Sequence, residues 1–393
     1  MDETIKPGLL RGAVSAVPSK SQAHRALICA ALADEPTRIE CAGTSRDIEA
    51  TEACLSALKA GGEGTVILPC GESGSTFRFL LPVLGALGRK ASFVLEGRLP
   101  QRPLSPLREE LVRHGCILSP QGSNPFMIEG RLTPGAYTLG AGVSSQFTSG
   151  LLFALPLLDG DSELSLTGKI ESFPYIELTM EMLEKFGVKI EFKDMLFSIP
   201  GGQKYRSPGT VNIEGDWSNA AFWLCANALP GNEVTVSGLD TDSKQGDKAV
   251  LKILELFGSD LSGIEIDAAD IPDLVPILSV VAAAAKGTTI IRNAGRLRIK
   301  ESDRLAAVTD MLGRLGADIR ETADGLIIHG GRPLTGGIVS SRGDHRIAMS
   351  AAIAAVLCTE PVVIRGAEAV SKSYPTFFEE RRRIECPHNT EKN

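Results

Sequence analysis

Apolar residues recur along the chain as short, nearly continuous runs, each preceded by a polar turn. Six such runs begin near Ser19, Gly74, Ser144, Asp216, Ile271 and Asp344. Their apolar bodies cover residues 25–33, 77–87, 147–158, 220–229, 274–285 and 347–357. A helix that is apolar on almost every side is expected to be buried. The last three starts follow the first three by about 200 residues, which indicates two similar halves of three units each.

A second, amphipathic type of helix recurs between the buried ones and ends at glycine. The pattern predicts such helices at 55–60, 107–114, 180–186, 253–257 and 309–315, with a shortened one at 377–385. Strand signals fill the gaps at 65–68, 92–95, 163–166, 188–192, 233–236, 288–292 and 362–365. Each unit thus combines strands with one buried and one half-exposed helix. The sequence predicts an α/β protein of two similar domains.

The boundary between the halves is expected near residues 208–215, before Asp216. A further strand at 9–17 precedes the first buried helix. The pattern alone allows this strand to belong to either half.

The composition is that of a globular protein, with 43% hydrophobic and 23% charged residues. The net charge of −7 argues against a nucleic-acid binder and requires any anion site to be a local cluster of cations. The start has no apolar signal segment, and the longest apolar run, 275–285, is too short to span a membrane. We expect a cytoplasmic protein with reduced thiols, in which Cys29, Cys225 and Cys358 are core residues.

The chemistry is organised around the stretch from Val17 to Arg25. Ser19 is a good helix N-cap, so Lys20 and Ser21 lie in the first turn and Arg25 lies about one turn further on. Cations are unfavourable at the positive end of a helix dipole unless an anion binds there. The stretch is therefore either half of an anion site or a capped helix with solvated cations.

Other helix starts also carry polar groups. The second is the glycine-rich turn 71–78, the third is Ser144-Ser145-Gln146, and the sixth is Asp344-His345-Arg346. Simple helix capping explains each of them singly. Their repetition on equivalent helices makes one shared binding site plausible.

Further cations lie in loops and at one more helix start. They are Arg102, Lys300, Arg304 and Lys372. Glu301 and Asp303 are possible partners for Lys300 and Arg304, which would be the purely structural reading.

The residues indicate an enzyme for small polyanions. Asp273 and Glu301 are the candidate proton-transfer carboxylates. His345 is the histidine placed at the site, whereas His24, His114, His329 and His388 are expected to be structural or solvated. The sequence carries no Walker A motif, dinucleotide fingerprint, HExxH motif or EF-hand loop, and nothing in it requires a metal.

Taken together, these motifs resemble those of the 5-enolpyruvylshikimate-3-phosphate synthases, a branch of the enolpyruvyl transferases. The resemblance runs from Val17 to about Phe378. It rests on Pro-Ser-Lys-Ser…Arg, Val-Ser-Ser-Gln-Phe, Ile-Pro-Asp, Lys-Glu-Ser-Asp-Arg-Leu, Asp-His-Arg-Ile-Ala-Met and Val-Ser-Lys-Ser-Tyr-Pro, in this order.

The resemblance implies two domains, each of three βαβαββ units around a pseudo-threefold axis, with the active site in the inter-domain cleft. It places residues 1–18 and 216–393 in one domain and 19–215 in the other, with hinges near 18–20 and 215–216. It also implies a monomer.

The implied reaction joins phosphoenolpyruvate to the 5-hydroxyl of shikimate 3-phosphate and releases phosphate, without a metal or organic cofactor and without a nucleic-acid or membrane partner. Asp273, Glu301 and Lys20 are the implied catalytic residues. The implied contacts to shikimate 3-phosphate are Lys20, Ser21, Arg25, Ser144, Ser145, Gln146, Ser172, Tyr175, Asp273 and Lys300. Those to phosphoenolpyruvate are Lys20, Gly74, Arg102, Gln146, Arg304, Arg346 and Lys372.

Three positions depart from the family pattern, one of them Phe79, which replaces a common Pro beside the glycine-rich loop. Glu72 replaces an Asn of the glycine-rich loop and is expected to point away from the anion or to pair with an arginine. Arg296 stands where bacterial members often carry an Asn that contacts the substrate phosphate.

Two alternative functions stay open. UDP-N-acetylglucosamine 1-carboxyvinyltransferase shares fold and chemistry, but commonly has a reactive Cys ahead of the Arg-Pro pair, and loop 95–101 here has none. A non-catalytic binder of small anions would need the cations but not Asp273 and Glu301.

Overall fold

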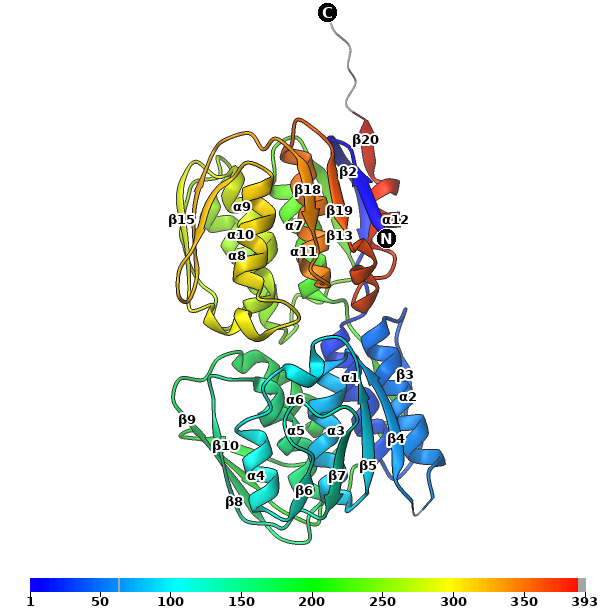
Figure 1. Cartoon of the computed structure of the whole chain (residues 1–393). Helices are drawn as coiled ribbons and strands as arrows, with labels where there is room; N and C mark the ends of the chain where they lie inside the picture. The colour runs from blue at the N-terminus through cyan, green and yellow to red at the C-terminus, as the bar shows by residue number, and fades with distance from the viewer. Residues whose placement is uncertain (63, 388–393) are drawn as a thin grey trace, which may run out of the picture. The chain divides into compact units, whose positions relative to one another are not determined.

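The computed structural model describes residues 1–62 and 64–387. The chain divides into two compact units (Figure 1). The N-terminal unit is Pro18–Glu214, and the C-terminal unit combines Met1–Val17 with Gly215–Asn393. The hinge function of the two crossing points stays a prediction.

The N-terminal unit contains the first three buried helices, α1 (Lys20–Leu32), α3 (Gly74–Leu87) and α5 (Ser145–Ala154). The amphipathic helices are α2 (Arg46–Ala60), α4 (Leu107–Arg113) and α6 (Phe173–Lys185). Short 3-10 turns η1 (Leu99–Gln101) and η2 (Leu155–Leu157) follow β5 and α5.

The strands of this unit form three sheets. One has the order β4-β5-β7-β6, with β4 (Val66–Gly71), β5 (Ala91–Leu95), β6 (Cys116–Leu118) and β7 (Phe126–Gly130). The second has the order β10-β11-β9-β8, with β8 (Ala136–Gly140), β9 (Ser162–Thr167), β10 (Glu191–Lys193) and β11 (Leu196–Ile199). In the third, β3 (Arg38–Glu40) pairs in parallel with β12 (Thr210–Asn212).

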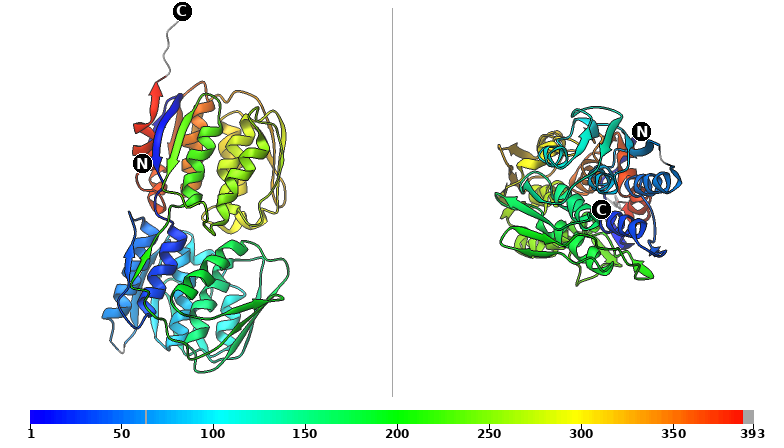
Figure 2. Two further views of the ribbon diagram at one scale, coloured as in Figure 1. Left: turned by 180° about the vertical axis from the view of Figure 1, so that it is seen from behind. Right: turned by 90° about the horizontal axis from the view of Figure 1, so that it is seen from below.

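The C-terminal unit repeats the plan with buried helices α7 (Trp217–Ala228), α9 (Val275–Ala284) and α11 (His345–Ala354). These three lie side by side with strands around them (Figure 2). The outer helices are α8 (Val250–Phe257), α10 (Arg304–Arg314) and α12 (Phe377–Arg383). Its 3-10 turns are η3 (Gly246–Ala249), η4 (Pro272–Leu274), η5 (Gly295–Ile299), η6 (Ala355–Leu357) and η7 (Ala367–Lys372).

Its sheets have the orders β14-β15-β17-β16, β1-β19-β18 and β13-β2-β20. The strands are β1 (Asp2–Ile5), β2 (Gly8–Ser15), β13 (Glu233–Ser237), β14 (Glu265–Asp267), β15 (Gly287–Arg292), β16 (Asp318–Glu321), β17 (Leu326–Gly330), β18 (Gly337–Ser340), β19 (Val362–Arg365) and β20 (Glu385–Pro387). The parallel pairing of β2 with β13, from Arg11–Glu233 to Ser15–Ser237, places the first long strand in this unit.

Each unit has its own core. Phe79, Phe153 and Tyr137 lie in the core of the N-terminal unit, and Trp223 and Phe377 lie in that of the C-terminal unit. Cys29, Cys225 and Cys358 are buried as predicted. Each core forms because its central helices are apolar on almost every side and pack closely against their neighbours.

Several predicted elements differ from the structure. The helices expected at 55–60 and 180–186 begin earlier, at Arg46 in α2 and at Phe173 in α6. The strand expected at 188–192 is shorter and later, because Gly187 to Ile190 turn out of α6 and β10 begins at Glu191. The helix expected at 377–385 ends at Arg383, and Glu385 starts β20, which pairs with β2. Strand pairing with a distant segment overrides helical propensity there.

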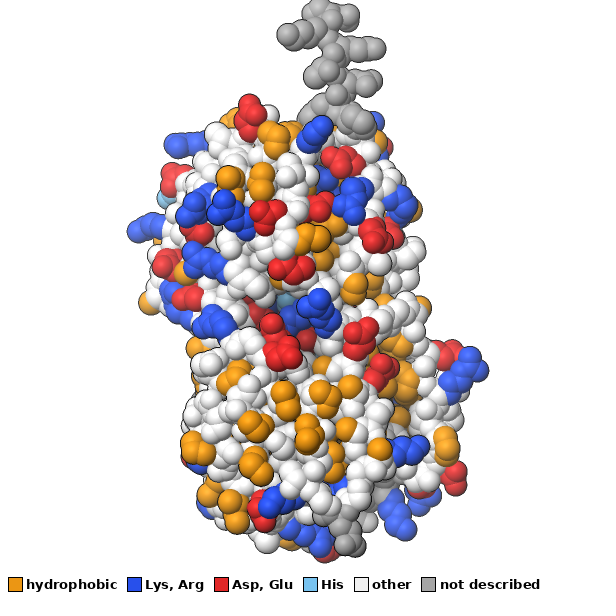
Figure 3. Space-filling model, turned by 45° about the vertical axis from the view of Figure 1, so that its right-hand side comes forward, with side chains coloured by type: hydrophobic (Ala, Val, Ile, Leu, Met, Phe, Trp, Pro, Cys, Tyr) orange, Lys and Arg blue, Asp and Glu red, His pale blue; other side chains and the backbone are white. Residues whose placement is uncertain are grey.

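The sheet β4-β5-β7-β6 alternates buried and exposed side chains. Val66 and Leu68 of β4 face the core, whereas Ile67 between them is exposed. Val94, Ile117 and Met127 are exposed on the same outer face. Hydrophobic side chains gather on the face of this unit seen in Figure 3. Within residues 1–62 and 64–387, no helix combines the length and apolarity needed to cross a membrane.

Candidate active site

The first buried helix begins as the sequence predicts. The Ser19 side chain accepts a hydrogen bond from the Gln22 amide at 3.4 Å, which confirms the N-cap. Lys20 Nζ donates to Asp47 Oδ2 at 2.8 Å, and both side chains are largely buried. Asp47 lies in the first turn of α2, where a carboxylate also suits the helix dipole. The ammonium of Lys20 is thus held in place by a neighbouring helix.

Arg25 is buried and bonded to neutral groups. Its guanidinium donates to Thr179 Oγ1 at 2.8 Å, to the Tyr175 carbonyl at 2.7 Å and to the Ser21 carbonyl at 2.6 Å. It also lies over the Phe79 ring, 5.1 Å from its centroid. Burial lowers the pKa of Arg25 to about 10. Arg25 therefore fixes α1 against α6, and its direct contact to substrate stays a prediction.

Gly74 and Arg102 lie together at the start of α3. A Cβ added to Gly74 would come within 2.9 Å of Arg102 Nη1. The absence of a side chain at residue 74 therefore lets the Arg102 guanidinium lie close to the backbone at the start of α3. Glu72 packs against Gly97, in the loop after β5. A Cβ added to Gly97 would lie only 2.7 Å from Glu72 Cδ.

Gln146 is oriented by two groups of α3. Its Oε1 accepts from Arg78 Nη1 at 2.8 Å, and its Nε2 donates to Ser75 Oγ at 2.9 Å. Arg78 Nη2 also donates to the Pro103 carbonyl at 3.0 Å, next to Arg102. Arg78 therefore links Gln146, an implied phosphoenolpyruvate contact, to Pro103, which follows the implied contact Arg102.

The remaining polar groups of this unit open α5 and α6. Ser144 caps α5 and accepts from the Gln146 amide at 3.3 Å, and Ser145 is the first helical residue. Ser172 precedes α6 with a φ of 57°, a left-handed conformation that is uncommon for serine, and Tyr175 lies in the first turn. Strained backbone of this kind is frequent at binding sites.

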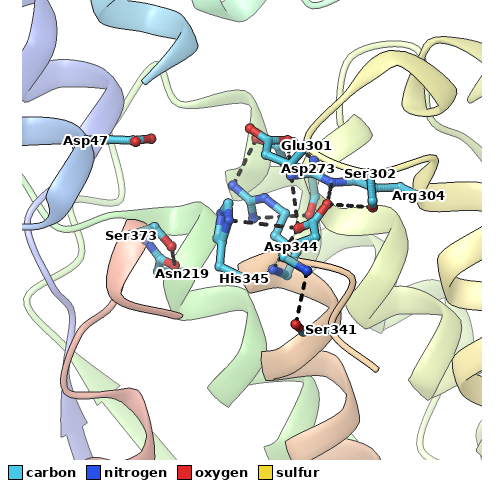
Figure 4. A network of polar contacts seen from close by, with 12 residues as sticks. Asp47, Asn219, Asp273, Glu301, Ser302, Arg304, Ser341, Asp344, His345 and Ser373 are labelled. Carbon is cyan, nitrogen blue, oxygen red and sulfur yellow. Dashed lines mark hydrogen bonds and ion pairs between the residues drawn. The ribbon is translucent and has the colours of Figure 1, made fainter. Parts of the chain in front are cut away.

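In the C-terminal unit, Arg304 is the centre of a buried ionic network (Figure 4). Its Nε pairs with Asp344 Oδ2, its Nη1 with Asp273 Oδ1 and its Nη2 with Glu301 Oε2, each at 2.7 Å. Burial opposes the charge of Arg304, but Asp344, Glu301 and Asp273 outweigh burial and raise its pKa above its usual value. The guanidinium is thus permanently charged.

A second arginine, Arg346, also binds the carboxylate of Asp273. Arg346 Nη2 pairs with Asp273 Oδ2 at 2.9 Å, and its Nη1 donates to the Asp273 carbonyl at 3.2 Å. Burial alone would raise the pKa of Asp273, but Arg346, Lys300 and Arg304 hold it well below its usual range. Asp273 is therefore ionised and restrained on both oxygens.

Three further cations that the sequence singled out in this unit are Lys300, Lys372 and Arg296. Burial lowers the pKa of Lys300 to about 8, against the opposing charge of Asp273. Lys372 ends η7 and is buried. Arg296, in η5, donates to the Ala269 carbonyl. Asp303 does not pair with Arg304: it caps α10 and pairs with Arg298 at 3.1 Å.

Sequence reasoning missed several residues that hold this site. In the sequence Asp344 stands out only as part of a helix start, yet it is fully buried, binds Arg304 and accepts a hydrogen bond from the Arg346 amide at 3.0 Å. Ser302 Oγ supports the same carboxylate at 3.0 Å. Asp247 is also buried, and burial together with the charge of Asp273 raises its pKa to about 6. The sequence signals were the helix-start position of Asp344 and the place of Ser302 in the Lys-Glu-Ser-Asp-Arg-Leu motif, whereas no motif pointed to Asp247.

In the part of the chain that the structure describes, no three His, Cys, Asp or Glu side chains are grouped as metal ligands. His345 is buried beside Asp344, with Nδ1 3.8 Å from its carboxylate. His388 lies outside the described residues.

Comparison with known proteins decides the family. The family described as EPSP synthase (3-phosphoshikimate 1-carboxyvinyltransferase) matches residues 5–380. The chain belongs to the EPSP synthase family. Its relatives in this family include the 3-phosphoshikimate 1-carboxyvinyltransferase of Clostridium kluyveri, 43% identical, with 97% of this chain and 96% of the relative covered. The protein of the same name from Clostridium acetobutylicum is 44% identical with the same coverage.

Solved structures agree with the family assignment. An EPSP synthase from Acinetobacter baumannii superposes with a TM-score of 0.80 at 26% identity and covers 98% of both chains. The two-domain α/β fold of this EPSP synthase family member is therefore the enolpyruvyl transferase fold that the motifs predicted.

Proposed function

We propose that this protein transfers the enolpyruvyl group of phosphoenolpyruvate to the 5-hydroxyl of shikimate 3-phosphate and releases phosphate. The observation that carries this proposal is the Arg304–Asp273–Arg346 cluster in a member of the EPSP synthase family. It joins two cations suited to phosphate and carboxylate with a carboxylate suited to accept a proton.

The cations and helix starts are proposed to divide between the two substrates. Arg102, Arg304, Arg346 and Lys372 would bind phosphoenolpyruvate, with Gly74 amides and Gln146. Shikimate 3-phosphate would contact the groups that open α1, α5 and α6, and Lys300. Arginine matches planar carboxylate and phosphate oxygens with paired donors, which supports this division. The cleft between the domains and the monomeric state stay predictions of the family resemblance.

Proton transfer is proposed for two carboxylates. Asp273 would take the proton of the 5-hydroxyl as its oxygen attacks C2 of phosphoenolpyruvate, while Glu301, helped by Lys20, would protonate the methylene carbon. The resulting tetrahedral intermediate then loses phosphate, which takes the proton held by Asp273, and returns a proton of the new methyl group to the Glu301 carboxylate, which restores the double bond.

The ion pairs of Asp273 limit its ability to act as a base. With both oxygens bound by arginines, its pKa is low and it is a poor proton acceptor. An anionic substrate that takes over part of the bonding of Arg304 and Arg346 would leave Asp273 more basic. The network therefore favours proton transfer only after phosphoenolpyruvate has bound.

The biological setting follows from the reaction. The protein would act in aromatic amino acid biosynthesis, and the cytoplasmic location expected from the sequence stays a prediction.

The first experiment is phosphate release from phosphoenolpyruvate by the purified protein, with no metal added. One reaction contains shikimate 3-phosphate and the other UDP-N-acetylglucosamine. We expect release only with shikimate 3-phosphate. Release only with the nucleotide sugar would identify the sister activity, and release with neither acceptor would contradict catalysis.

A further inference from the structure

A chain of four hydrogen-bonding side chains is buried inside the N-terminal unit. His24 Nδ1 lies 2.7 Å from Thr51 Oγ1, Thr51 Oγ1 lies 2.6 Å from Thr76 Oγ1, and Thr76 Oγ1 donates to Ser73 Oγ at 2.7 Å. All four residues have 0% of their surface exposed. The chain therefore connects α1, α2 and the N-cap of α3 through the core.

The direction of the whole chain follows from the Thr76–Ser73 hydrogen bond, in which Thr76 is the donor. Thr76 uses its hydroxyl proton on Ser73, so Thr76 must accept from Thr51. Thr51 then has no proton left for His24, so His24 Nδ1 must carry hydrogen and donate. Burial lowers the pKa of His24 to about 3, which agrees with a neutral ring. Within the described residues, Nε2 of this ring has no hydrogen-bond partner.

Both ends of this chain lie beside proposed substrate contacts. His24 is one helical turn after Lys20 on α1, and Thr51 is one turn after Asp47, the partner of Lys20. At the other end, Ser73 caps α3 and immediately precedes Gly74. The Ser73 amide in turn donates to the Cys70 carbonyl at 3.0 Å, which closes the turn from β4. The position of the glycine-rich turn is thus tied to the helix that carries Lys20.

A core made only of apolar side chains would not need these four hydrogen-bonding residues. Burying hydroxyls and an imidazole costs free energy unless each is bonded, and apolar residues of similar shape can fill such a space as well. A directional chain, in contrast, allows only one arrangement of its members. Such restraint matters most where backbone amides must be held in place for a ligand.

We propose that His24, Thr51, Thr76 and Ser73 form a positioning network that holds the Ser73–Gly74 turn in the geometry that binds phosphoenolpyruvate. This inference rests on the proposed function. The network touches no reacting atom, so its members are positioning residues. It should affect the affinity for phosphoenolpyruvate more than that for shikimate 3-phosphate.

The decisive variant is Thr51→Val, because Thr51 is not among the proposed substrate contacts and valine keeps the branched shape. The change removes the acceptor of His24 and the donor to Thr76. We expect KM for phosphoenolpyruvate to rise roughly ten-fold or more, since small displacements of binding groups have effects of that size. KM for shikimate 3-phosphate should stay within about two-fold, and Thr51→Ser should restore most of the loss.

Thr289→Val is the matched control. Thr289 is equally buried, in β15 of the C-terminal unit. Within the described residues, its hydroxyl accepts one long hydrogen bond, of 3.4 Å, from the Ile264 amide. This variant should lower thermal stability without separating the two KM values.

The outcomes separate the two proposals. Equal KM changes for both substrates in Thr51→Val, or a KM pattern like that of Thr289→Val, would overturn the positioning network. Failure of the wild-type protein to release phosphate would instead contradict the proposed function. Nitrogen-15 NMR of the His24 ring gives a readout independent of activity: we expect hydrogen on Nδ1 in the wild type, and hydrogen on Nε2 would overturn the inferred direction.

Discussion

Cations near the helix starts have different partners in the two units. In the N-terminal unit, Arg25 and Arg78 donate mainly to hydroxyl, amide and carbonyl oxygens, so their charge is not cancelled by these bonds. In the C-terminal unit, by contrast, the single guanidinium of Arg304 contacts three carboxylates. The same repeated architecture therefore surrounds its arginines with neutral groups in one unit and with carboxylates in the other, although Lys20 of the N-terminal unit also pairs with a carboxylate, that of Asp47.

The free energy needed to bury these arginines also differs between the two units. Neutral partners keep a guanidinium hydrogen-bonded without burying further charge. A buried ionic network is costly to assemble and still more costly to break, because removing one member leaves the others unpaired. The C-terminal cluster should thus be the more sensitive of the two to single substitutions.

The largest effect is expected for Asp273→Asn. The amide keeps the shape but cannot accept the hydroxyl proton, so kcat should fall by at least about 100-fold. Steady-state kinetics measure this loss, and calorimetric titration with shikimate 3-phosphate checks that binding is retained. Unaltered turnover would remove Asp273 from the mechanism and favour a binding protein or another base.

The second prediction compares Arg304→Met with Arg25→Met. Arg304→Met leaves Asp273, Glu301 and Asp344 without their shared cation and should lower the free energy of unfolding by about 3–5 kcal/mol. Arg25→Met leaves neutral partners and should cost about 1–3 kcal/mol. Urea unfolding of both variants measures the difference. Equal losses would show that the partners of the two arginines are energetically alike.

The third prediction concerns the Gly74–Arg102 contact. In Gly74→Ala the added Cβ would displace the guanidinium, which lies 2.9 Å from its position. KM for phosphoenolpyruvate should then rise by roughly ten- to thirty-fold. Gly313→Ala is a fair control, because a Cβ there meets no heavy atom within 4 Å. A normal KM in Gly74→Ala would mean that Arg102 can move without loss.

The smallest effect is a pH dependence carried by Lys300. Burial lowers its pKa to about 8, so its ammonium loses the proton as the pH rises from 7 to 9. Its bond to an anionic substrate weakens in the same direction, and KM for shikimate 3-phosphate should rise by about three- to ten-fold. Lys300→Arg keeps the charge and should flatten the profile. A flat profile in the wild type would exclude Lys300 as the titrating group.

Local features of the molecule could be predicted from the sequence. Five of the six buried helices begin at or next to the expected residues, because capping side chains and apolar runs are local properties. The remaining one, α9, begins at Val275, after the 3-10 turn η4 that starts at Pro272. The family motifs gave the fold and the reaction class. Asp303 shows the limit of local reasoning: it is near Arg304 in sequence, but it caps α10 and pairs with Arg298.

By itself, then, the sequence determined which segments form helices, that they repeat, and which of their first turns carry charge. The tertiary structure decided which charges meet. Asp344 reaches Arg304 across 40 positions of chain, and His24 reaches Ser73 only through Thr51 and Thr76. Such contacts depend on how helices pack, and packing is set by the whole core rather than by any local pattern.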